Sequence, residues 1–450
     1  MDGLLFKLYA ALMWLAQPLL RRKLARRALR EPGYGQAIGE RFGRYTQPVE
    51  VRSELLWVHA VSLGETRTAA LLLDALRAAQ PGLRVLLTHG TATGRAEGAG
   101  LLRPGDVQVW QPWDSPAAVA RFFSHFQPRL GVLMETEVWP CTVAAARQRG
   151  VPLVLANARL SDKSLQQALR LSPLALPAYA ALTAVLAQTE GDAARFAQLG
   201  VSAQVVGNLK FDATPSAVLL ARGQAWRQAL GQPVVMLVSS RDGEEQLFLE
   251  ASHALAGANI ADFAIDSGAT SPLPRLLLVP RHPQRFDEVA ALAVQHGLSV
   301  SRRSQWPDAG PATSPAALAA DLWLGDSLSE MPLYYALADV ALLGGSFAPL
   351  GGQNLIEAAA CACPVVMGPH TFNFADAATQ ADAAGAARRA PDMAVGLALA
   401  LQLAHDPAAQ ASAAAAGTAF AASNRGATAR TVKAVLDALA GKLPPVRKGR

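Results

Sequence analysis

Cysteine is scarce in this chain, and Cys141, Cys361 and Cys363 provide neither a disulfide framework nor a CxxC zinc pattern. Such usage is typical of a reducing, cytosolic compartment. The eight histidines are scattered, and no HExxH or paired ligand spacing indicates a metal site. Charged residues are few (17%) beside hydrophobic ones (51%), which excludes a disordered chain. We therefore expect about two to three globular domains without metal or cofactor.

Only one apolar run approaches the length of a bilayer crossing. It spans residues 4–20, but Lys7, Gln17 and Pro18 weaken it. The next segment, 21–30, reads "RRKLARRALR" and contains no acid. A secretory signal carries its charge before the apolar run and ends in small residues, which this segment does not. A buried amphipathic helix is one interpretation. We favour a membrane-associated helix whose basic collar contacts the anionic cytoplasmic leaflet.

Strand-like and helix-like segments alternate through the first half of the chain. The predicted strands begin with "LLWVHAV" and are 55–61, 84–90, 107–113, the start of 129–140, and 151–160. Segments with helical periodicity separate them, and residues 184–212 complete this half. This order is typical of right-handed βαβ units and a parallel sheet.

The pattern restarts in the second half. The predicted strands there are 233–240, 275–283, 321–326, 338–347 and 363–369, and residues 257–272 interrupt one unit as a surface insertion. The fold class is therefore α/β, with two doubly wound, Rossmann-like lobes. We predict a membrane anchor at 1–30, a first lobe at 31–215 and a second lobe at 216–450. An alternative is that the final helices pack back on the first lobe. Ligands in such sheets bind outside the carboxyl ends of the strands, so we expect the site in a cleft between the lobes.

The segment 344–369, "GGSFAPLGGQNLIEAAACACPVVMGP", places glycines between a predicted strand and a helix that starts near Gln353. Glycine lets backbone N–H groups approach a ligand, and a helix amino terminus favours an anion. Glu357 lies about one turn inside, where its carboxylate suits a ribose diol. This pattern is typical of a nucleotide monophosphate site. The alternative is a glycine-rich turn with a first-turn acid favoured by the helix dipole, and the local features leave both open.

Polar residues recur at the other predicted strand ends. They include Gly64, Glu65, Thr91, Thr93, Arg95, Glu135, Glu137, Arg159, Ser161, Lys163, Asn208, Lys210, Ser240, Arg241, Arg281 and His282. Taken singly, each is more simply a cap or a surface charge. Together at one edge of each sheet they indicate a site for anionic ligands.

These motifs resemble one family. "HAVSLGE", "ETEVWP", "NARLSDKS", "GNLKFD", "PRHPQRF", "GDSLSEMPLYYALADVALLGGSF" and "GGQNLIEAAACACPVVMGP" are similar, in order, to the Kdo transferases of lipopolysaccharide assembly. Those are membrane-associated glycosyltransferases of the GT-B fold, which move 3-deoxy-D-manno-octulosonic acid (Kdo) from CMP-Kdo to a lipid A precursor. The resemblance covers about residues 55–375. Gln353 stands where a histidine is expected, and residues 257–272 are extra.

The resemblance implies a role for each matching residue. Glu65 resembles the general base that deprotonates the acceptor hydroxyl, the alternative being a helix-start acid. Direct displacement would then invert the anomeric centre without a metal. The donor-binding candidates are Arg95, Arg281, Met331, Gly352, Asn354 and Glu357, and the acceptor or transition-state candidates are Glu135 and Lys210.

The resemblance also implies partners and a location. The partners would be CMP-Kdo, the lipid A precursor (lipid IVA) and the cytoplasmic leaflet of the inner membrane, with no nucleic acid. Three alternatives stay open: another GT-B glycosyltransferase, a soluble sugar-nucleotide epimerase of the same two-lobed fold, and a periplasmic solute-binding protein.

Overall fold

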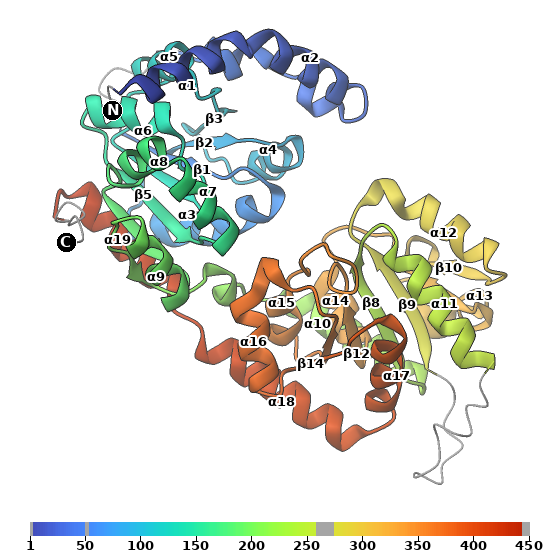
Figure 1. Ribbon diagram of the computed structural model, residues 1–450. Helices are drawn as coiled ribbons and strands as arrows, with labels where there is room; N and C mark the ends of the chain where they lie inside the picture. Colours follow the sequence, from blue (N-terminus) through green and yellow to red (C-terminus); the bar gives the residue numbers. More distant parts are fainter. Residues whose placement is uncertain (1–2, 50–53, 258–273, 443–450) are drawn as a thin grey trace. The chain divides into compact units, whose positions relative to one another are not determined.

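The computed structural model describes residues 3–49, 54–257 and 274–442. The chain divides into two compact units, one formed by residues 1–212 with 425–450 and the other by residues 213–424 (Figure 1). The predicted insertion at 257–272 lies, apart from Gly257, outside the described residues. Each unit is an α/β layer structure, which confirms the fold class predicted for both halves.

The first unit is built on a parallel sheet whose central strands, β1, β4 and β5, are buried throughout. Among the described residues its strands lie in the order β3-β2-β1-β4-β5-β6-β7. Their bounds are β1 Leu55–His59, β2 Arg84–His89, β3 Val107–Trp110, β4 Leu130–Met134, β5 Leu153–Ala158, β6 Ala184–Ala187 and β7 Gln204–Val205. The order reverses between β1 and β4, and loops at the carboxyl ends beside such a reversal form the usual ligand crevice of a doubly wound sheet.

Helices cover both faces of this sheet because its strands are near-continuous apolar runs. They are α3 Leu63–Ala79, α4 Ala92–Ala99, α5 Pro116–Phe126, α6 Pro140–Gln148, α7 Asp162–Arg170, α8 Ser172–Tyr179, α9 Glu190–Gln198 and the carboxy-terminal α19 Ala427–Leu439. Helix α19 packs on α3, and Asp212 accepts hydrogen bonds from the amides of Gly426 and Thr428. The carboxy-terminal helix therefore belongs to the first unit.

The second unit repeats the architecture. Its described strands lie in the order β10-β11-β9-β8-β12-β13-β14 and pair in parallel. The bounds are β8 Val234–Ser240, β9 Arg275–Pro280, β10 Val300–Arg302, β11 Leu322–Leu324, β12 Val340–Leu343, β13 Val365–Met367 and β14 Ala387–Arg389. The covering helices are α10 Ala217–Leu230, α11 Glu244–Gly257, α12 Phe286–Gln295, α13 Pro315–Ala319, α14 Met331–Leu337, α15 Leu355–Ala360, α16 Ala375–Ala383, α17 Met393–Ala404 and α18 Pro407–Ser423. Here the order reverses between β8 and β12.

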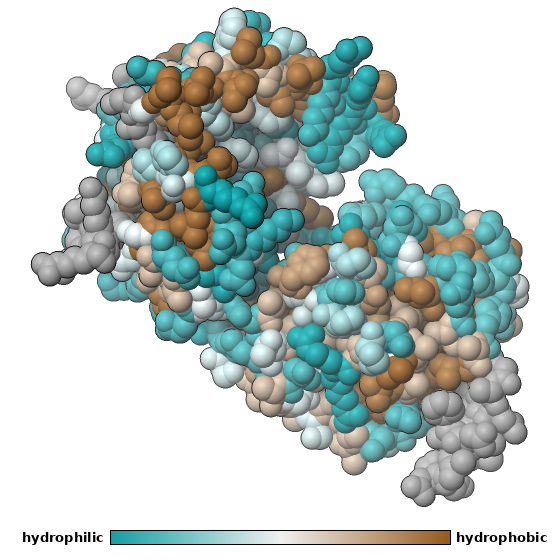
Figure 2. Space-filling model, viewed as in Figure 1, coloured by the Kyte–Doolittle hydropathy of each residue, from teal (hydrophilic) through white to brown (hydrophobic). Residues whose placement is uncertain are grey.

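The amino-terminal apolar run forms part of two short helices, α1 (Leu4–Leu15) and α2 (Gln17–Ala28). One face of α1 packs on the core of the first unit through Phe6, Tyr9 and Ala10. The opposite face is exposed, and hydrophobic side chains gather over α1 while hydrophilic ones cover the far end of α2 (Figure 2). In the described part of the chain, no single helix combines the length and the apolar character that a bilayer crossing requires.

Candidate functional site

The carboxyl edge of the first sheet gathers the polar residues that the sequence singled out, around the reversal between β1 and β4. Glu65 follows β1, Glu135 and Glu137 follow β4, and Lys210 follows β7 in the short 3-10 helix η3 (Leu209–Asp212). Asn157 is the next-to-last residue of β5. Because parallel strands end at one edge, side chains from four strand ends meet here.

Glu65 is placed by the local sequence "SLGE" at the start of α3. Ser62 is the N-cap and accepts a hydrogen bond from the Glu65 amide at 3.3 Å. In return, Glu65 Oε1 accepts from the Ser62 hydroxyl and Oε2 from the Val61 amide, both at 2.9 Å. This reciprocal arrangement is a form of the capping box. The carboxylate is therefore a helix-start acid in geometry, half-buried at the sheet edge, whatever further role it has.

The electrostatics of Glu65 suit proton abstraction. Burial raises the pKa of its carboxyl above the ordinary value, and the negative charges of Glu135 and Glu137 raise it further. The hydrogen bonds from Val61 and Ser62 oppose that shift without cancelling it. A carboxylate of raised pKa is a stronger base than an exposed one, which is the property that general-base catalysis needs.

Glu135 forms an ion pair with Lys210, with 2.8 Å between Oε1 and Nζ. Burial disfavours its charged form, yet Lys210, Arg159 and Asn157 together hold the pKa of Glu135 below the ordinary value. Lys210 is therefore directed at Glu135, and the pair forms one charged unit at the edge of the sheet.

The backbone at this point is turned rather than extended. Glu135 and Asn157 have φ of 57° and 52°, in the left-handed region that non-glycine residues rarely adopt. Asn157 also accepts from the Leu209 amide at 3.0 Å, which fixes the segment that carries Lys210. Such strained positions cluster at functional sites. Glu135 therefore lies in a turn that follows β4 and not in the extended strand itself.

His59 is a site residue that sequence reasoning did not select. It is buried at the end of β1, its Nδ1 lies 2.9 Å from Thr88 Oγ1, and its Nε2 lies 3.9 Å from Glu137. Burial acts against ionisation of Glu137, but His59 and the Trp139 indole, which donates at 2.7 Å, hold its pKa below the ordinary value. The only sequence signal is that "HAVSLGE" places His59 six residues before Glu65.

Arg95, which is predicted to bind the sugar-nucleotide donor, forms an ion pair with a carboxylate of its own unit. Its guanidinium lies 2.6 Å from Glu40 Oε2 and 4.8 Å from the ring centre of Trp110. Glu40 is buried and also accepts from the Trp110 amide at 2.8 Å. The role of Arg95 toward a ligand stays a prediction.

In the second unit, the backbone of the loop after β12 requires glycine at several positions. Gly345, Gly351 and Gly352 have φ of 72°, 91° and 74°, which favour glycine over residues with a Cβ. A Cβ at Gly344 would lie 2.4 Å from the carbonyl oxygens of Val238 and Ser239. The glycine-rich turn therefore needs these residues for its own backbone.

The same loop uses many of its amides internally. Glu244 accepts from the amides of Gly345 at 2.6 Å, Phe347 at 3.0 Å and Ala348 at 3.3 Å. The Gly352 amide donates to the Gly345 carbonyl at 2.7 Å. These amides already donate hydrogen bonds to groups of the protein. An anion that binds at this loop would therefore have to contact groups other than these amides. The proposed contact of Gly352 with a ligand stays a prediction.

Two predicted CMP-Kdo-binding residues of this unit, Arg281 and Glu357, act electrostatically on one buried tyrosine, Tyr335. Tyr335 lies in α14, one turn after the half-buried Met331. Burial raises the pKa of Tyr335, the charge of Glu357 raises it further and that of Arg281 lowers it, so both charges lie within its reach. Asn354 caps α15, accepting from the Ile356 amide at 3.2 Å, and Glu357 stands in the first turn. Arg281 and Glu357 are thus within electrostatic reach of the same side chain.

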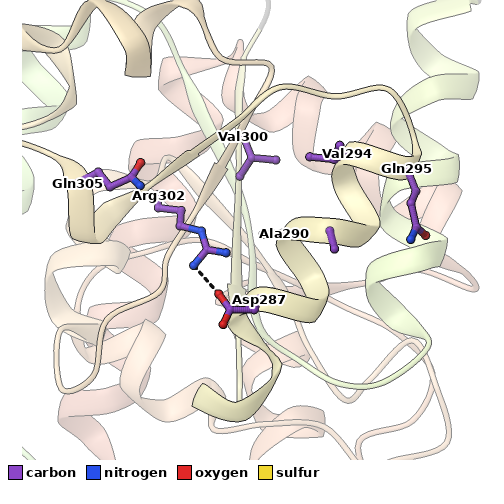
Figure 3. Close-up of a pocket in the computed structure, with 8 residues that line it drawn as sticks. Asp287, Ala290, Val294, Gln295, Val300, Arg302 and Gln305 are labelled. Carbon is purple, nitrogen blue, oxygen red and sulfur yellow. Dashed lines mark hydrogen bonds and ion pairs between the residues drawn. The ribbon is translucent and has the colours of Figure 1, made fainter.

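A separate surface pocket of about 580 Å³ lies between α12 and β10 (Figure 3). Its lining is mostly apolar, and Arg302 pairs there with Asp287 at 2.6 Å. It lies at the β10 edge of the sheet, whereas the donor candidates follow β9 and β12 or lie in α14 and α15. Within the described residues, no group of three His, Cys, Asp or Glu side chains is placed to hold a metal ion.

Comparisons with known proteins agree on one family. The family model described as 3-deoxy-D-manno-octulosonic-acid transferase (kdotransferase) matches residues 36–213. A 3-deoxy-D-manno-octulosonic acid transferase of Bordetella pertussis is 48% identical over 93% of this chain and 96% of its own length. A protein of the same name from Haemophilus influenzae is 31% identical over 81% of this chain and 82% of its own length.

Two solved structures show the fold alone. Anabaena Alr3699/HepE, in complex with UDP-glucose, is 14% identical with a TM-score of 0.55, over 85% of this chain and 99% of its own. A UDP-N-acetylglucosamine 2-epimerase is 12% identical with a TM-score of 0.54, over 89% of this chain and 99% of its own.

Proposed function

Because this chain belongs to the 3-deoxy-D-manno-octulosonic acid transferase family, we propose that it transfers Kdo from CMP-Kdo to the lipid A precursor and releases CMP. The observation that carries this proposal is the 48% identity to a Kdo transferase along 93% of the chain. The position and raised pKa of Glu65 support it independently, because transfer to a hydroxyl requires a base.

In the proposed reaction Glu65 takes the proton from the acceptor hydroxyl. The acceptor oxygen forms a bond to the anomeric carbon of Kdo as the bond from that carbon to the CMP phosphate oxygen breaks. The electron pair of the broken bond leaves with CMP, which is a phosphate monoester, and the anomeric centre is inverted. Lys210, paired with Glu135, is the candidate for stabilising charge on the acceptor side.

The donor is proposed to bind the second unit at the loops beside the reversal between β8 and β12. Glu357 would accept hydrogen bonds from the ribose diol, and Asn354 and Met331 would contact the nucleotide. Arg281 would compensate the phosphate without a metal ion, and Arg95 and Gly352 complete the candidate set. The observation in favour is that Arg281 and Glu357 both act electrostatically on Tyr335, which lies in the same helix as Met331. These roles are those of a GT-B glycosyltransferase.

The protein is proposed to act at the cytoplasmic side of the inner membrane, with α1 lying in the interface. The exposed face of α1 carries Leu8 and Leu12, which are 51% and 64% exposed. The opposite face is fixed, because the Tyr9 hydroxyl donates to the buried Asp114 at 2.9 Å. The basic residues of α2 and its carboxyl end (Arg21, Arg22, Lys23, Arg26, Arg27 and Arg30) would contact anionic headgroups.

The alternative functions are less well supported. The likeness to an epimerase is one of fold, at 12% identity, and the fold serves several chemistries. Another GT-B glycosyltransferase would share the architecture but not the identity to Kdo transferases along the chain.

The direct test is to incubate the purified protein with CMP-Kdo and tetra-acylated lipid A precursor and to weigh the products by mass spectrometry. We expect release of CMP and a lipid product heavier by one or more Kdo residues. The mass also gives the number of residues added. CMP release without a heavier lipid, or no reaction with this donor, would refute the proposal.

A further inference from the structure

We propose that Glu244 is a positioning residue of the donor site, whose buried carboxylate holds the glycine-rich loop after β12 in its binding conformation. The inference rests on the proposed function, since it takes the donor to bind beside this loop. It adds a residue that contacts no substrate and acts through Gly345, Phe347 and Ala348.

Glu244 is fully buried at the start of α11, directly after the end of β8. Its Oε2 accepts from the Gly345 amide at 2.6 Å and the Arg241 amide at 3.0 Å. Its Oε1 accepts from the amides of Phe347 at 3.0 Å and Ala348 at 3.3 Å. One carboxylate thus binds four backbone donors from two loops at the point where the sheet order reverses.

Successive backbone amides that converge on one point form a nest, a geometry that binds anions. Here Glu244 supplies the anion, so the loop is shaped before any ligand arrives. A buried amide without a partner is costly, and the carboxylate satisfies three of them in this loop at once. A neutral side chain offers fewer acceptors in the same space and cannot replace all of these bonds.

The anchored turn extends to the predicted donor residues. The Gly345 carbonyl accepts from the Gly352 amide at 2.7 Å, and the Gly344 carbonyl accepts from the Gln353 amide at 3.0 Å. Asn354, the cap of α15, follows at once. Displacing Gly345 therefore displaces Gly352 and the start of the helix that carries Glu357.

The neighbouring Glu245 shows that a buried carboxylate at this point of the chain does not by itself hold the glycine-rich loop. It is as fully buried as Glu244, but it accepts from the Ser240 hydroxyl and from Arg285, both at 2.8 Å. Its contacts join the ends of β8 and β9 and do not involve the glycine-rich loop.

The test compares CMP affinity in the full-length protein, by titration calorimetry, for wild type, Glu244→Gln and Glu244→Asp. Glutamine has the size of glutamate but directs an N–H₂ group at backbone N–H groups, so we expect CMP to bind at least tenfold more weakly. Aspartate retains both acceptor oxygens on a shorter side chain, so we expect an intermediate affinity. The KM for CMP-Kdo should rise in parallel, while the pH dependence that reports Glu65 stays unchanged.

The matched control is Asp339→Asn. Asp339 accepts from the Val234 amide at 2.7 Å and from Arg227 at 2.6 Å, at the amino ends of β8 and β12. This substitution removes a comparable carboxylate from the same unit, and we expect CMP affinity to change less than twofold.

Each outcome is decisive. CMP affinity of wild-type strength in folded Glu244→Gln, or an equal loss in Asp339→Asn, would overturn the inference while leaving the proposed function intact. If Glu244→Gln does not fold, Glu244→Asp decides, since wild-type affinity there would equally overturn it. Wild-type protein that fails to bind CMP would overturn the proposed donor as well.

Discussion

Two substitutions of Glu65 separate its part in helix capping from its proposed part in catalysis. The carboxylate accepts from the Val61 amide and the Ser62 hydroxyl. In Glu65→Gln the amide oxygen still accepts from Val61, and the amide nitrogen donates to Ser62 Oγ, because a hydroxyl both donates and accepts. In Glu65→Ala both bonds are lost. The glutamine variant therefore keeps the capping contacts and lacks only the base.

The expected magnitudes follow from these contacts. Losing two hydrogen bonds of about 0.5–1.5 kcal/mol each lowers the free energy of unfolding of Glu65→Ala by about 1–3 kcal/mol. Glu65→Gln loses about 0.3–1 kcal/mol of helix-dipole interaction but also removes a partly desolvated charge, so its stability stays within about 1 kcal/mol of wild type. Loss of the general base should lower turnover about 10²–10⁴-fold in both variants.

The pH dependence of stability gives a further check. The folded-state pKa of Glu65 is raised, so its neutral form is the one that folding favours. Its contribution to wild-type stability is present in acid and is lost as the pH rises through the folded pKa. Any stability advantage of wild type over Glu65→Gln should therefore shrink from acid to neutral pH.

The assays are Kdo transfer by mass spectrometry, CMP affinity by calorimetry and unfolding in urea. CMP affinity should stay near the wild-type value, because Glu65 is assigned to the acceptor. Ser62→Ala is the control: it removes the cap, at about 1 kcal/mol, but keeps the carboxylate and should keep transfer. Wild-type turnover in Glu65→Gln would show that Glu65 serves only as a cap. An inactive but folded Ser62→Ala would show that the capping contacts themselves are needed for transfer, so that loss of activity in Glu65→Ala could not be assigned to the base.

Three further predictions concern the surroundings of this residue and the membrane face. Glu137→Gln removes a charge that raises the pKa of Glu65, so the acidic limb of kcat/KM should move to lower pH, and an unmoved limb would contradict the assignment. Lys210→Met removes the cation that keeps the pKa of Glu135 low. In urea unfolding, the stability advantage of wild type over this variant should be full at neutral pH and should vanish as the pH falls through the folded-state pKa of Glu135. A difference in stability that does not depend on pH would contradict this prediction. Leu8→Glu with Leu12→Glu should reduce co-sedimentation with anionic vesicles and leave CMP affinity unchanged, while Val218→Glu, on an exposed position of α10, should bind vesicles as wild type does.

Much of the fold could be predicted because the parallel strands are buried on both faces and appear as apolar runs. The strands missed in the second half were β10 (Val300–Arg302) and β14 (Ala387–Arg389). Both are three-residue edge strands that end in arginine, and short, charged edges are how sheets avoid pairing with other chains. Such strands are defined by the neighbour they pair with, which a local pattern does not record.

The candidate site could be predicted in part for the same reason. Residues directly after a strand, such as Glu65 and Glu135, are found once the strands are found. The hydrogen bonds that fix the site could not be found in this way. Asn157 accepts from the Leu209 amide, 52 residues later in the sequence, and Glu244 accepts from the Gly345 amide, 101 residues later. These contacts depend on the strand orders β5-β6-β7 and β8-β12, which the sequence does not state.

The glycines after β12 have a structural reason that the sequence pattern does not separate from ligand binding. They suggested a cradle for phosphate, and Gly345, Gly351 and Gly352 adopt the left-handed backbone conformations that the turn itself requires. The amides from Gly345 to Ala348 converge as a phosphate cradle would, and the anion they meet is Glu244. Because these amides already bind a carboxyl group, we expect another group to balance the charge of the proposed donor phosphate. Arg281 directly follows β9 and lies within electrostatic reach of Tyr335, and we propose it as that group. On this argument Arg281 bears more of the phosphate recognition than the glycines do.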